Sequence, residues 1–161
     1  MVTYRLAHNT DAEALLQTRR CAVLQNRTDN YSNAILEAWA PTVDAATIHT
    51  EAEALTDPDR VTLVAEIEGK MVGLCTLGVT EGLLKQCYVL PEYNGLGIAR
   101  ELVKQIEVIA KERGVRTLKL SSSLIALDFY KKQGYTELYS YHYDLGDGLQ
   151  MPCVMMEKGD V

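Results

Sequence analysis

The chain has 161 residues, which is the length of one compact domain with a single hydrophobic core. Hydrophobic residues make up 47% and charged residues 24% of the sequence, a balance that excludes a disordered chain. The formal net charge of −6 would repel a phosphate backbone, and no run of Lys and Arg offsets it, so we do not expect a nucleic-acid partner.

The cysteines and the N-terminus bear on location. The four cysteines show no CxxC spacing, and the N-terminus carries charges where a signal peptide would be apolar. No uncharged stretch approaches the ~18 apolar residues of a membrane span; the longest runs from Met71 to Thr80. These features predict a cytoplasmic protein with no membrane partner, whose acidic field would attract a cationic substrate such as an amine.

The first part of the chain predicts a strand followed by helices. Thr10 and Glu13 form a capping-box pattern that opens the first helix. Pro41 separates the next two helical segments, and the sequence Asp57-Pro58-Asp59 ends the second of them. The expected elements are a strand over Val2–Ala7 and helices over Thr10–Gln25, Tyr31–Trp39 and Ala45–Leu55.

The middle of the chain predicts an antiparallel meander followed by a strand–helix–strand unit. Glu68-Gly69-Lys70 is a hairpin signal, and Thr80-Glu81-Gly82 is short enough to make the next strand antiparallel as well. Gly114 ends an amphipathic helix that follows Pro91. The expected strands are Val61–Ile67, Met71–Val79, Leu83–Leu90 and Val115–Ser121, and the helix has apolar residues at Ala99, Leu102, Val103, Ile106, Ile109 and Ala110.

The end of the chain predicts a short helix and a hairpin. Ser122 and Ser123 are expected to cap a helix that ends at Gly134. Strands over Tyr135–Asp144 and Leu149–Lys158 would then pair around two glycines. We therefore predict one α/β domain over residues 1–161, with a mixed, mostly antiparallel sheet, a central parallel strand pair and helices on both faces.

A turn containing Gly95 and Gly97 lies between a strand and the amphipathic helix. Because Pro91 cannot continue the strand, the turn places free backbone N–H groups at a helix N-terminus. Such groups, together with the helix dipole, bind phosphate. Two glycines alone also fit a tight connection that binds nothing. Neither a P-loop pattern nor a Rossmann fingerprint is present, since Arg100 stands three residues after Gly97.

The turn resembles the signature segment of the GNAT superfamily of N-acetyltransferases. In that family the pattern is Arg or Gln, two residues, Gly, one residue, then Gly or Ala, and here it falls on Asn94, Gly97 and Ala99. Asn94 departs from the pattern because its side chain is shorter, which puts a supporting contact to phosphate in doubt. The backbone N–H groups of residues 95–100 are unaffected by that change.

A second family pattern follows at the matching distance. The family has an Asn, an Ala and a Phe-Tyr pair before a Gly and an aromatic residue. In this chain the pattern is Ser123, Ala126, Phe129-Tyr130 and Gly134-Tyr135, so Ser replaces the Asn expected to contact the pantetheine arm. Order and spacing agree from about residue 61 to residue 135, and the opening strand and helix fit as well.

The resemblance implies a GNAT-like fold, acetyl-CoA as cosubstrate, no metal, and direct attack by a primary amine in a ternary complex. It implies that the pantetheine arm inserts between two splayed strands. The N–H of Val89 would hold the thioester carbonyl, and Tyr130 would act as the general acid. The cofactor contacts that it implies are Cys87, Tyr88, Val89, Asn94, Gly95, Leu96, Gly97, Ile98, Ala99, Arg100, Ser123, Ala126 and Tyr130.

The general base is left open. Many family members have a Glu where this chain has Lys85, and a lysine is a poor base. Glu81 is the first candidate, His142 and Asp144 are alternatives, and a water chain could replace all three. Cys87 as an acyl-accepting nucleophile is discounted, because no His or carboxylate partner is near it in sequence.

The acceptor cannot be named from the sequence. Tyr135, Tyr139, Tyr141 and Tyr143 are expected to share one face of a strand, where they would line an acceptor pocket or a half-wet sheet face. The acceptor would be the amine of a small molecule, a peptide or a protein. A CoA-binding regulatory module without catalysis and a phosphate site for another nucleotide remain alternatives. Sheet edges offer a surface for a homodimer.

Overall fold

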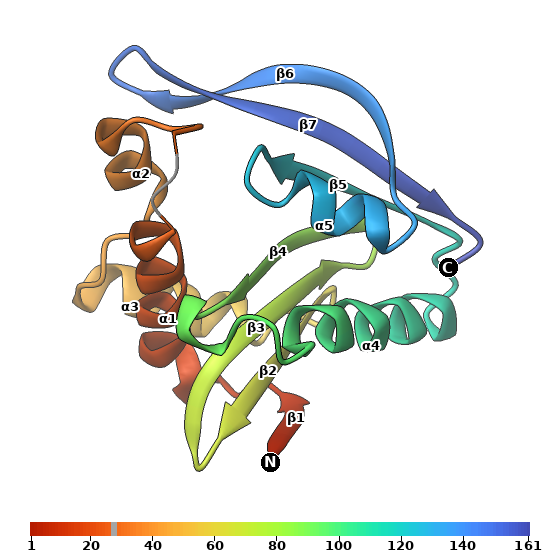
Figure 1. Cartoon of the computed structure of the whole chain (residues 1–161). Coiled ribbons are helices and arrows are strands. Elements are labelled where there is room, and N and C mark those ends of the chain that lie inside the picture. The colour runs from red at the N-terminus through yellow and green to blue at the C-terminus, as the bar shows by residue number, and fades with distance from the viewer. Residues whose placement is uncertain (27–28) are drawn as a thin grey trace.

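The structure is a computed structural model that describes residues 1–26 and 29–161. Within these residues the strands form one sheet in the order β1-β2-β3-β4-β5-β7-β6 (Figure 1). Every neighbouring pair is antiparallel except β4 and β5, so the predicted mixed sheet with a central parallel pair is confirmed. The strands are β1 (Val2–Leu6), β2 (Arg60–Ile67), β3 (Lys70–Gly78), β4 (Leu83–Val89), β5 (Thr117–Ser123), β6 (Thr136–Gly146) and β7 (Leu149–Gly159).

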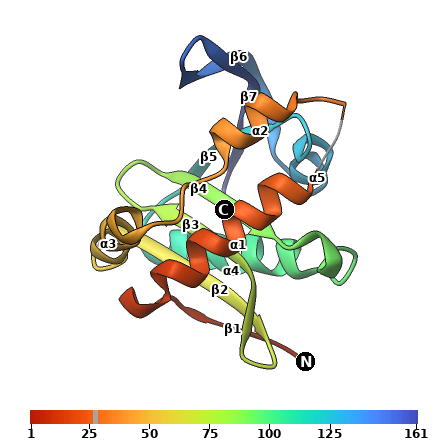
Figure 2. The ribbon, with the colours of Figure 1, turned by 90° about the vertical axis from the view of Figure 1, so that its left-hand side faces the viewer.

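Helices cover both faces of the sheet, as predicted. On one face Leu102 and Ile106 of α4 pack with Leu118 of β5 in the main core. On the other face Leu15 of α1 packs against Val64 of β2, and Figure 2 shows α1 crossing in front of the strands. The helices are α1 (Ala12–Gln25), α2 (Asn33–Trp39), α3 (Ala45–Ala54), α4 (Ile98–Glu112) and α5 (Leu127–Lys132), with short 3-10 turns at Asn9–Asp11 and Pro91–Tyr93.

The predicted capping box at the start of the first helix is wrong. A 3-10 turn occupies the position of Thr10, and α1 begins only at Ala12. The carboxylate that caps this entry belongs to Asp11, which accepts a hydrogen bond from the N–H of His8 at 2.7 Å. A Thr-to-Glu spacing therefore suggested the right helix but the wrong capping residues, because the capping contact runs from the N–H of His8 to the carboxylate of Asp11, at the start of the 3-10 turn.

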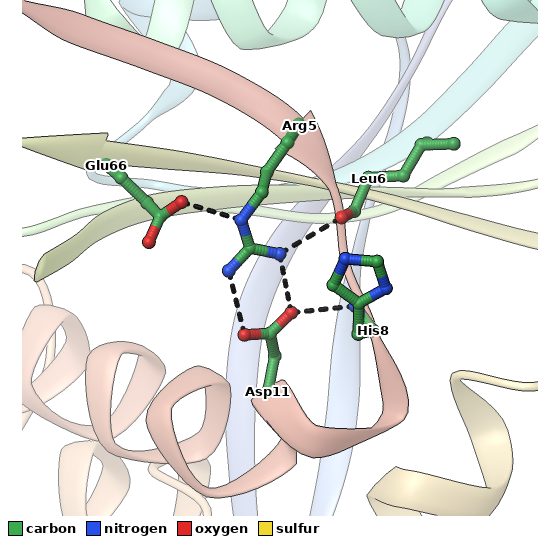
Figure 3. Close-up of polar contacts among 5 residues, drawn as sticks. All are labelled: Arg5, Leu6, His8, Asp11 and Glu66. Atoms are coloured by element: carbon green, nitrogen blue, oxygen red, sulfur yellow. Dashed lines mark hydrogen bonds and ion pairs between the residues drawn. The ribbon is translucent and has the colours of Figure 1, made fainter. Parts of the chain in front are cut away.

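Arg5 joins three elements at this corner of the molecule (Figure 3). Its guanidinium donates two hydrogen bonds to the carboxylate of Asp11, at 2.7 and 2.9 Å. Its Nε donates to Glu66 of β2 at 2.6 Å, and its Nη1 also donates to the carbonyl of Leu6 at 3.1 Å. A planar guanidinium suits such paired contacts with carboxylates. The edge strand β1, strand β2 and the entry to α1 are thereby held together.

The two tight hairpins follow from their turn sequences. Glu68 and Gly69 connect β2 to β3 with φ angles of 51° and 77°. Asp147 and Gly148 lie between β6 and β7 with φ angles of 51° and 75°. Two successive residues with positive φ form the turn whose twist matches paired strands. The sequence therefore identified both hairpins.

The serines before the last helix have a different place from the one predicted. Ser122 and Ser123 belong to β5, and α5 begins only at Leu127. The hydroxyl of Ser123 nevertheless accepts a hydrogen bond from the N–H of Ala126 at 3.2 Å. Strand and turn overlap here, because a serine can pair in a sheet through its backbone while its side chain caps the following turn.

Candidate active site

The parallel strands β4 and β5 separate almost as soon as they meet. Leu83 and Lys119 are their one register pair, and the N–H of Lys119 donates to the carbonyl of Gly82 at 2.9 Å. On its other side β4 has a bulge, because Thr76 of β3 pairs with Gln86 while the next residue pairs with Leu84. A bulge bends a strand. Figure 1 shows the two strands diverging toward their C-terminal ends.

Backbone groups line the resulting gap. The N–H of Leu90 donates to the carbonyl of Val72 at 2.9 Å and so points toward β3. Because N–H groups alternate in direction along a strand, those of Cys87 and Val89 point away from β3 and toward β5. By the same alternation from Lys119, the backbone groups of residues 121 and 123 face β4. Since β4 and β5 pair only at Leu83, these groups offer an edge to an extended ligand.

A cavity of about 320 Å³ (the gap cavity) lies in the gap, and elements from both faces of the sheet line it. Ala126 and Tyr130, from the α5 side, form one part of its wall. Val23 and Trp39, from α1 and α2 on the opposite face, form another part. Groups approaching from the two faces of the sheet can therefore meet beside Val89.

A second cavity of about 350 Å³ lies over the turn between β4 and α4. Gly95 and Gly97 have φ angles of 83° and 76°, and Gly97 is the N-terminal cap of α4. The first N–H groups of a helix have no partner within it, so this turn directs free donors outward. The two cavities form a continuous path, since Val89, Asn94, Ala99 and Phe129 line both.

Most of the expected cofactor residues lie on this path. Strand β4 supplies Cys87, Tyr88 and Val89 to the gap cavity, and the segment from the end of β5 into α5 supplies Ser123, Ala126 and Tyr130. Leu96 is an exception, because its side chain is exposed and lines neither cavity. The residues of the turn that line the cavity over it are Asn94, Gly95, Gly97, Ile98, Ala99 and Arg100.

Tyr130 has the surroundings of a proton donor. Its ring is buried and packs edge-on against Phe129, with centroids 5.1 Å apart, and against Tyr135 at 5.8 Å. Burial raises the pKa of its hydroxyl well above the usual value, and the nearby thiol of Cys87 adds to that effect. The hydroxyl therefore stays protonated at neutral pH.

The candidates for a general base lie outside the described lining of the gap cavity. Glu81 forms an ion pair with Lys85 at 2.8 Å before the start of β4, and its side chain is half exposed. His142 and Asp144 are exposed residues of β6. Lys85 lines the cavity, but neither Glu81 nor the two β6 residues are part of its described lining.

The charge of the site is positive within an acidic protein. Lys85 is the only charged residue among those described around the gap cavity, and Arg100 is the only one among those described around the cavity over the turn. The N-terminus of α4 carries the partial positive charge of the helix dipole, and together with Arg100 it is suited to an anion. None of the described helices could cross a membrane, and no group of His, Cys, Asp or Glu in the described part of the chain could hold a metal ion.

Three of the four tyrosines expected to share one face of a strand do so. The register is unbroken from Tyr139 through Tyr141 to Tyr143, and the rings of Tyr139 and Tyr141 have centroids 6.0 Å apart. Tyr135 does not belong to this row. Tyr135 precedes β6, is buried in the main core, and donates a hydrogen bond to Glu107 at 3.0 Å. A register shift after residue 137 then changes the alternation of the strand. Tyr139 and Tyr143 are exposed, and only Tyr141 reaches the cavity wall, through a hydrogen bond with Ser121.

Sequence reasoning missed the aromatic wall on the α2 side. Trp39 packs against Tyr88 with ring centroids 6.1 Å apart and against Tyr31 at 6.0 Å. Tyr31 is fixed by a hydrogen bond to the carbonyl of Pro152 at 2.6 Å, and burial raises its pKa to about 12. The single tryptophan of the chain was a usable signal, because a large aromatic residue in a weakly patterned segment commonly serves a binding surface.

Comparison with known proteins agrees with this geometry. A GCN5-related N-acetyltransferase from Rhodopseudomonas palustris has a TM-score of 0.86 at 25% identity, over 98% of this chain and 94% of that chain. The PaiA N-acetyltransferase from Thermoplasma acidophilum, solved in complex with coenzyme A, has the same fold, with a TM-score of 0.78 at 21% identity over 99% of each chain.

The sequence relatives cover a smaller region. A Chlorobaculum tepidum protein described as an uncharacterized N-acetyltransferase is 30% identical over 86 residues, which are 50% of this chain and 52% of that protein. The chain spans about half the length of the curated relatives it matches. The acetyltransferase (GNAT) family itself matches residues 22–135, a range that includes β4, the glycine turn and Tyr130. Because this range is more than half of the chain, the protein belongs to the acetyltransferase (GNAT) family.

Proposed function

We propose that the protein is an acetyl-CoA-dependent N-acetyltransferase that moves the acetyl group to a primary amine by direct attack in a ternary complex. The observation that carries this proposal is the gap between β4 and β5, where the two strands pair only at Leu83 and where elements from both faces of the sheet line a cavity. A cofactor on the α5 side and an amine on the α2 side would meet there.

The donor half follows from the backbone. The pyrophosphate would lie over the turn at residues 94–100, where helix N–H groups and Arg100 supply positive potential. The pantetheine arm would extend along the gap as an additional strand. The N–H of Val89 would hold the thioester oxygen as negative charge develops on it, which lowers the barrier to attack. Tyr130 would protonate the departing thiolate.

The acceptor half lacks a carboxylate in its described lining. An amine arriving at Val89 would therefore lose its proton to water in the open cavity, with Glu81 the remaining candidate if Lys85 releases it. Aromatic walls from Trp39 and Tyr88 suit an amine with an organic body. These features support an amine acceptor of a small molecule or a peptide.

A thiol-release assay tests the proposal directly. Acetyl-CoA is mixed with a panel of small amines and peptides, and free CoA is measured with a thiol reagent. We expect release above the rate without acceptor for at least one class of amine. Acetyl-CoA is also expected to raise the melting temperature while ATP and NAD do not.

The second candidate is a CoA-binding regulatory module without catalysis. The position of Lys85, where many family members have a base, and the ion pair that occupies Glu81 favour it. This alternative predicts the same rise in melting temperature with acetyl-CoA, but no release of free CoA across the panel. The two assays together separate it from the enzyme and from a site for another nucleotide.

A further inference from the structure

Two cysteines face each other across β3 and β4 at the wall of the cavity in the gap between β4 and β5. Cys75 and Cys87 are direct register partners, and both thiols are free. The N–H of Leu90 donates a hydrogen bond to the carbonyl of Val72, so these two residues form a hydrogen-bonded pair of the antiparallel ladder. Hydrogen-bonded and non-hydrogen-bonded pairs alternate along the ladder, and Cys75–Cys87 is therefore a non-hydrogen-bonded pair. The Cα atoms of such pairs lie about 4.5 Å apart. Disulfides span Cα separations of about 4.4–6.8 Å, so these thiols can join with little backbone movement.

The two thiols differ in access. Cys75 is completely buried, whereas Cys87 is partly exposed and lines the cavity together with Val89 and Tyr130. Burial raises the pKa of Cys75 well above its ordinary value, and a hydrogen bond with Cys87 adds to this. A reagent in the cavity can reach Cys87 alone, while Cys75 can reach only its partner. This division suits an attacking thiol and a resolving thiol.

The inference rests on the proposed placement of acetyl-CoA. If Val89 and Tyr130 hold the thioester, the sulfur of CoA lies next to Cys87, two residues earlier on the same strand. We propose that Cys87 is a thiol–disulfide exchange site for CoA disulfides bound in the cofactor gap, and that Cys75 resolves the resulting adduct. Binding of the CoA moiety in the gap would hold the disulfide beside the thiol, which raises the effective concentration of the disulfide at Cys87.

The two steps balance without a further oxidant. In the first, the thiolate of Cys87 attacks a sulfur of the CoA disulfide, the reagent's S–S bond breaks, and one CoA leaves as a thiol with the proton that Cys87 lost. In the second, Cys75 gives up its proton and attacks the sulfur of Cys87, the bond between Cys87 and CoA breaks, and the second CoA leaves as a thiol with that proton. The CoA disulfide is reduced by two electrons, and the two cysteines are oxidised to a disulfide.

The adduct and its resolution can be separated with variants. All proteins carry Cys21→Ser, because Cys21 is exposed and would react independently. After exposure to CoA disulfide, the background protein is expected to lose two hydrogens, release two CoA thiols and show a Cys75–Cys87 bond by peptide mapping. Cys75→Ala should instead retain one CoA on Cys87, and Cys87→Ala should show neither product. A stable CoA adduct in the background protein, or no change at Cys87, would overturn the proposal.

Controls separate this inference from the proposed function. Oxidised glutathione, which lacks the nucleotide part of CoA, should react at least tenfold more slowly, and saturating acetyl-CoA should suppress the reaction. Equal rates for both disulfides would mean that Cys87 is merely accessible, which contradicts a built site. If acetyl-CoA stabilises the protein before exposure to CoA disulfide, but Cys87 then stays unmodified, the exchange proposal is wrong while the proposed function stands. If acetyl-CoA gives no stabilisation, the proposed function fails first. A melting curve of Cys75→Ala, with Cys75→Ser as the second variant, checks folding.

Discussion

Tyr130 is the side chain on which the proposed chemistry depends most. Its position came from a sequence pattern, since Phe129, Gly134 and Tyr135 stand in register with it. The structure adds that the ring is held edge-on between two aromatic neighbours inside the cavity wall. A buried phenol keeps its proton across the neutral range, because the charged form loses hydration. Such a group can give a proton to a thiolate but cannot take one from an amine.

Removing this hydroxyl tests the assignment. We expect Tyr130→Phe to lower the rate of acetyl transfer tenfold or more, which is about 1.4 kcal/mol of barrier. The melting temperature and the stabilisation by acetyl-CoA should stay close to wild type, because the ring contacts remain. Single-turnover release of CoA measures the change. Wild-type turnover in the variant would remove Tyr130 from the mechanism.

The missing carboxylate predicts a particular pH dependence. If water accepts the proton, the rise of kcat/KM with pH should follow the pKa of the acceptor amine itself, because only the neutral amine attacks. A series of amines that differ in pKa but share one carbon skeleton would shift this limb in parallel. A limb that stays fixed across the series would indicate a protein base, and Glu81→Gln would then be the first variant to test.

Residue roles were predictable only where spacing encodes them. The turn and Tyr130 belong to ordered patterns along the chain. Trp39 and Tyr31 were missed as wall residues because their pairing with β4 and β7 joins segments far apart in sequence. Tyr135 was wrongly grouped with Tyr139, Tyr141 and Tyr143 for a related reason, since the register shift before Tyr139 has no signal in residue type.

At the scale of elements, the entry to α4 depends on backbone conformation. Gly97 caps the helix in the left-handed region, and nothing lies within 4 Å of the place where a Cβ would stand. A side chain there would therefore meet no neighbour, and its cost would come from the dihedral angle alone. Gly114, just past the other end of the same helix, has φ of 82° and equally open space.

These two glycines form a matched pair for mutation. Gly97→Ala and Gly114→Ala should each lower the free energy of unfolding by about 1 kcal/mol, because alanine is strained at positive φ. Only Gly97→Ala should also reduce the melting-temperature increase produced by acetyl-CoA, since its N–H belongs to the proposed phosphate cradle. Equal loss of acetyl-CoA stabilisation in both variants would contradict the cradle.

The corner at Arg5 gives a pH-dependent stability. Hydrogen bonds from Arg5 lower the pKa of Asp11 below its ordinary value, so the folded state favours the ionised carboxylate. This stabilisation is present above the unfolded pKa and is lost as pH falls through the folded one. Asp11→Asn should cost about 1 kcal/mol at pH 7, a value that allows for the partial exposure of Arg5. Urea unfolding should show this cost shrinking below about pH 4.

The control for that variant is Glu13→Gln. Glu13 is exposed on α1 and bonds only Gln17 at 3.2 Å in the described structure, so its loss removes the same charge with little effect on stability. A pH-independent cost for Asp11→Asn would mean that packing, rather than the ion pair with Arg5, accounts for the destabilisation.

At the scale of the whole molecule, the sheet is two groups of strands joined at one point. Strands β1 to β4 form one group and β5, β7 and β6 the other, with Leu83 and Lys119 as their one register pair. Hairpin turns made the neighbours β2–β3 and β6–β7 predictable, since short turns force adjacent pairing. The insertion of β7 between β5 and β6 was not predictable, because no local pattern encodes which strand a hairpin presents to the rest of the sheet.

Hydrogen exchange can report whether a ligand joins the two groups. The amides of Cys87 and Val89 face the gap, whereas that of Tyr88, between them, is directed to β3. Acetyl-CoA should slow exchange at the two gap-facing amides at least tenfold and leave Tyr88 nearly unchanged. Uniform slowing along β4 would indicate general stabilisation instead, and no slowing at Val89 would contradict insertion of the cofactor between the strands.

The glycine turn also bears on how this protein can diverge in evolution. The proposed contacts of this turn with the cofactor come from N–H groups whose direction is set by the dihedral angles of Gly95 and Gly97. The neighbouring side chains can therefore change without loss of these contacts. Asn94 and the exposed Leu96 illustrate such changes, since neither is needed to aim an amide. Selection at this turn would thus act on conformation more than on chemistry, leaving the α2 side of the cavity to adapt to new amines while the cofactor stays the same.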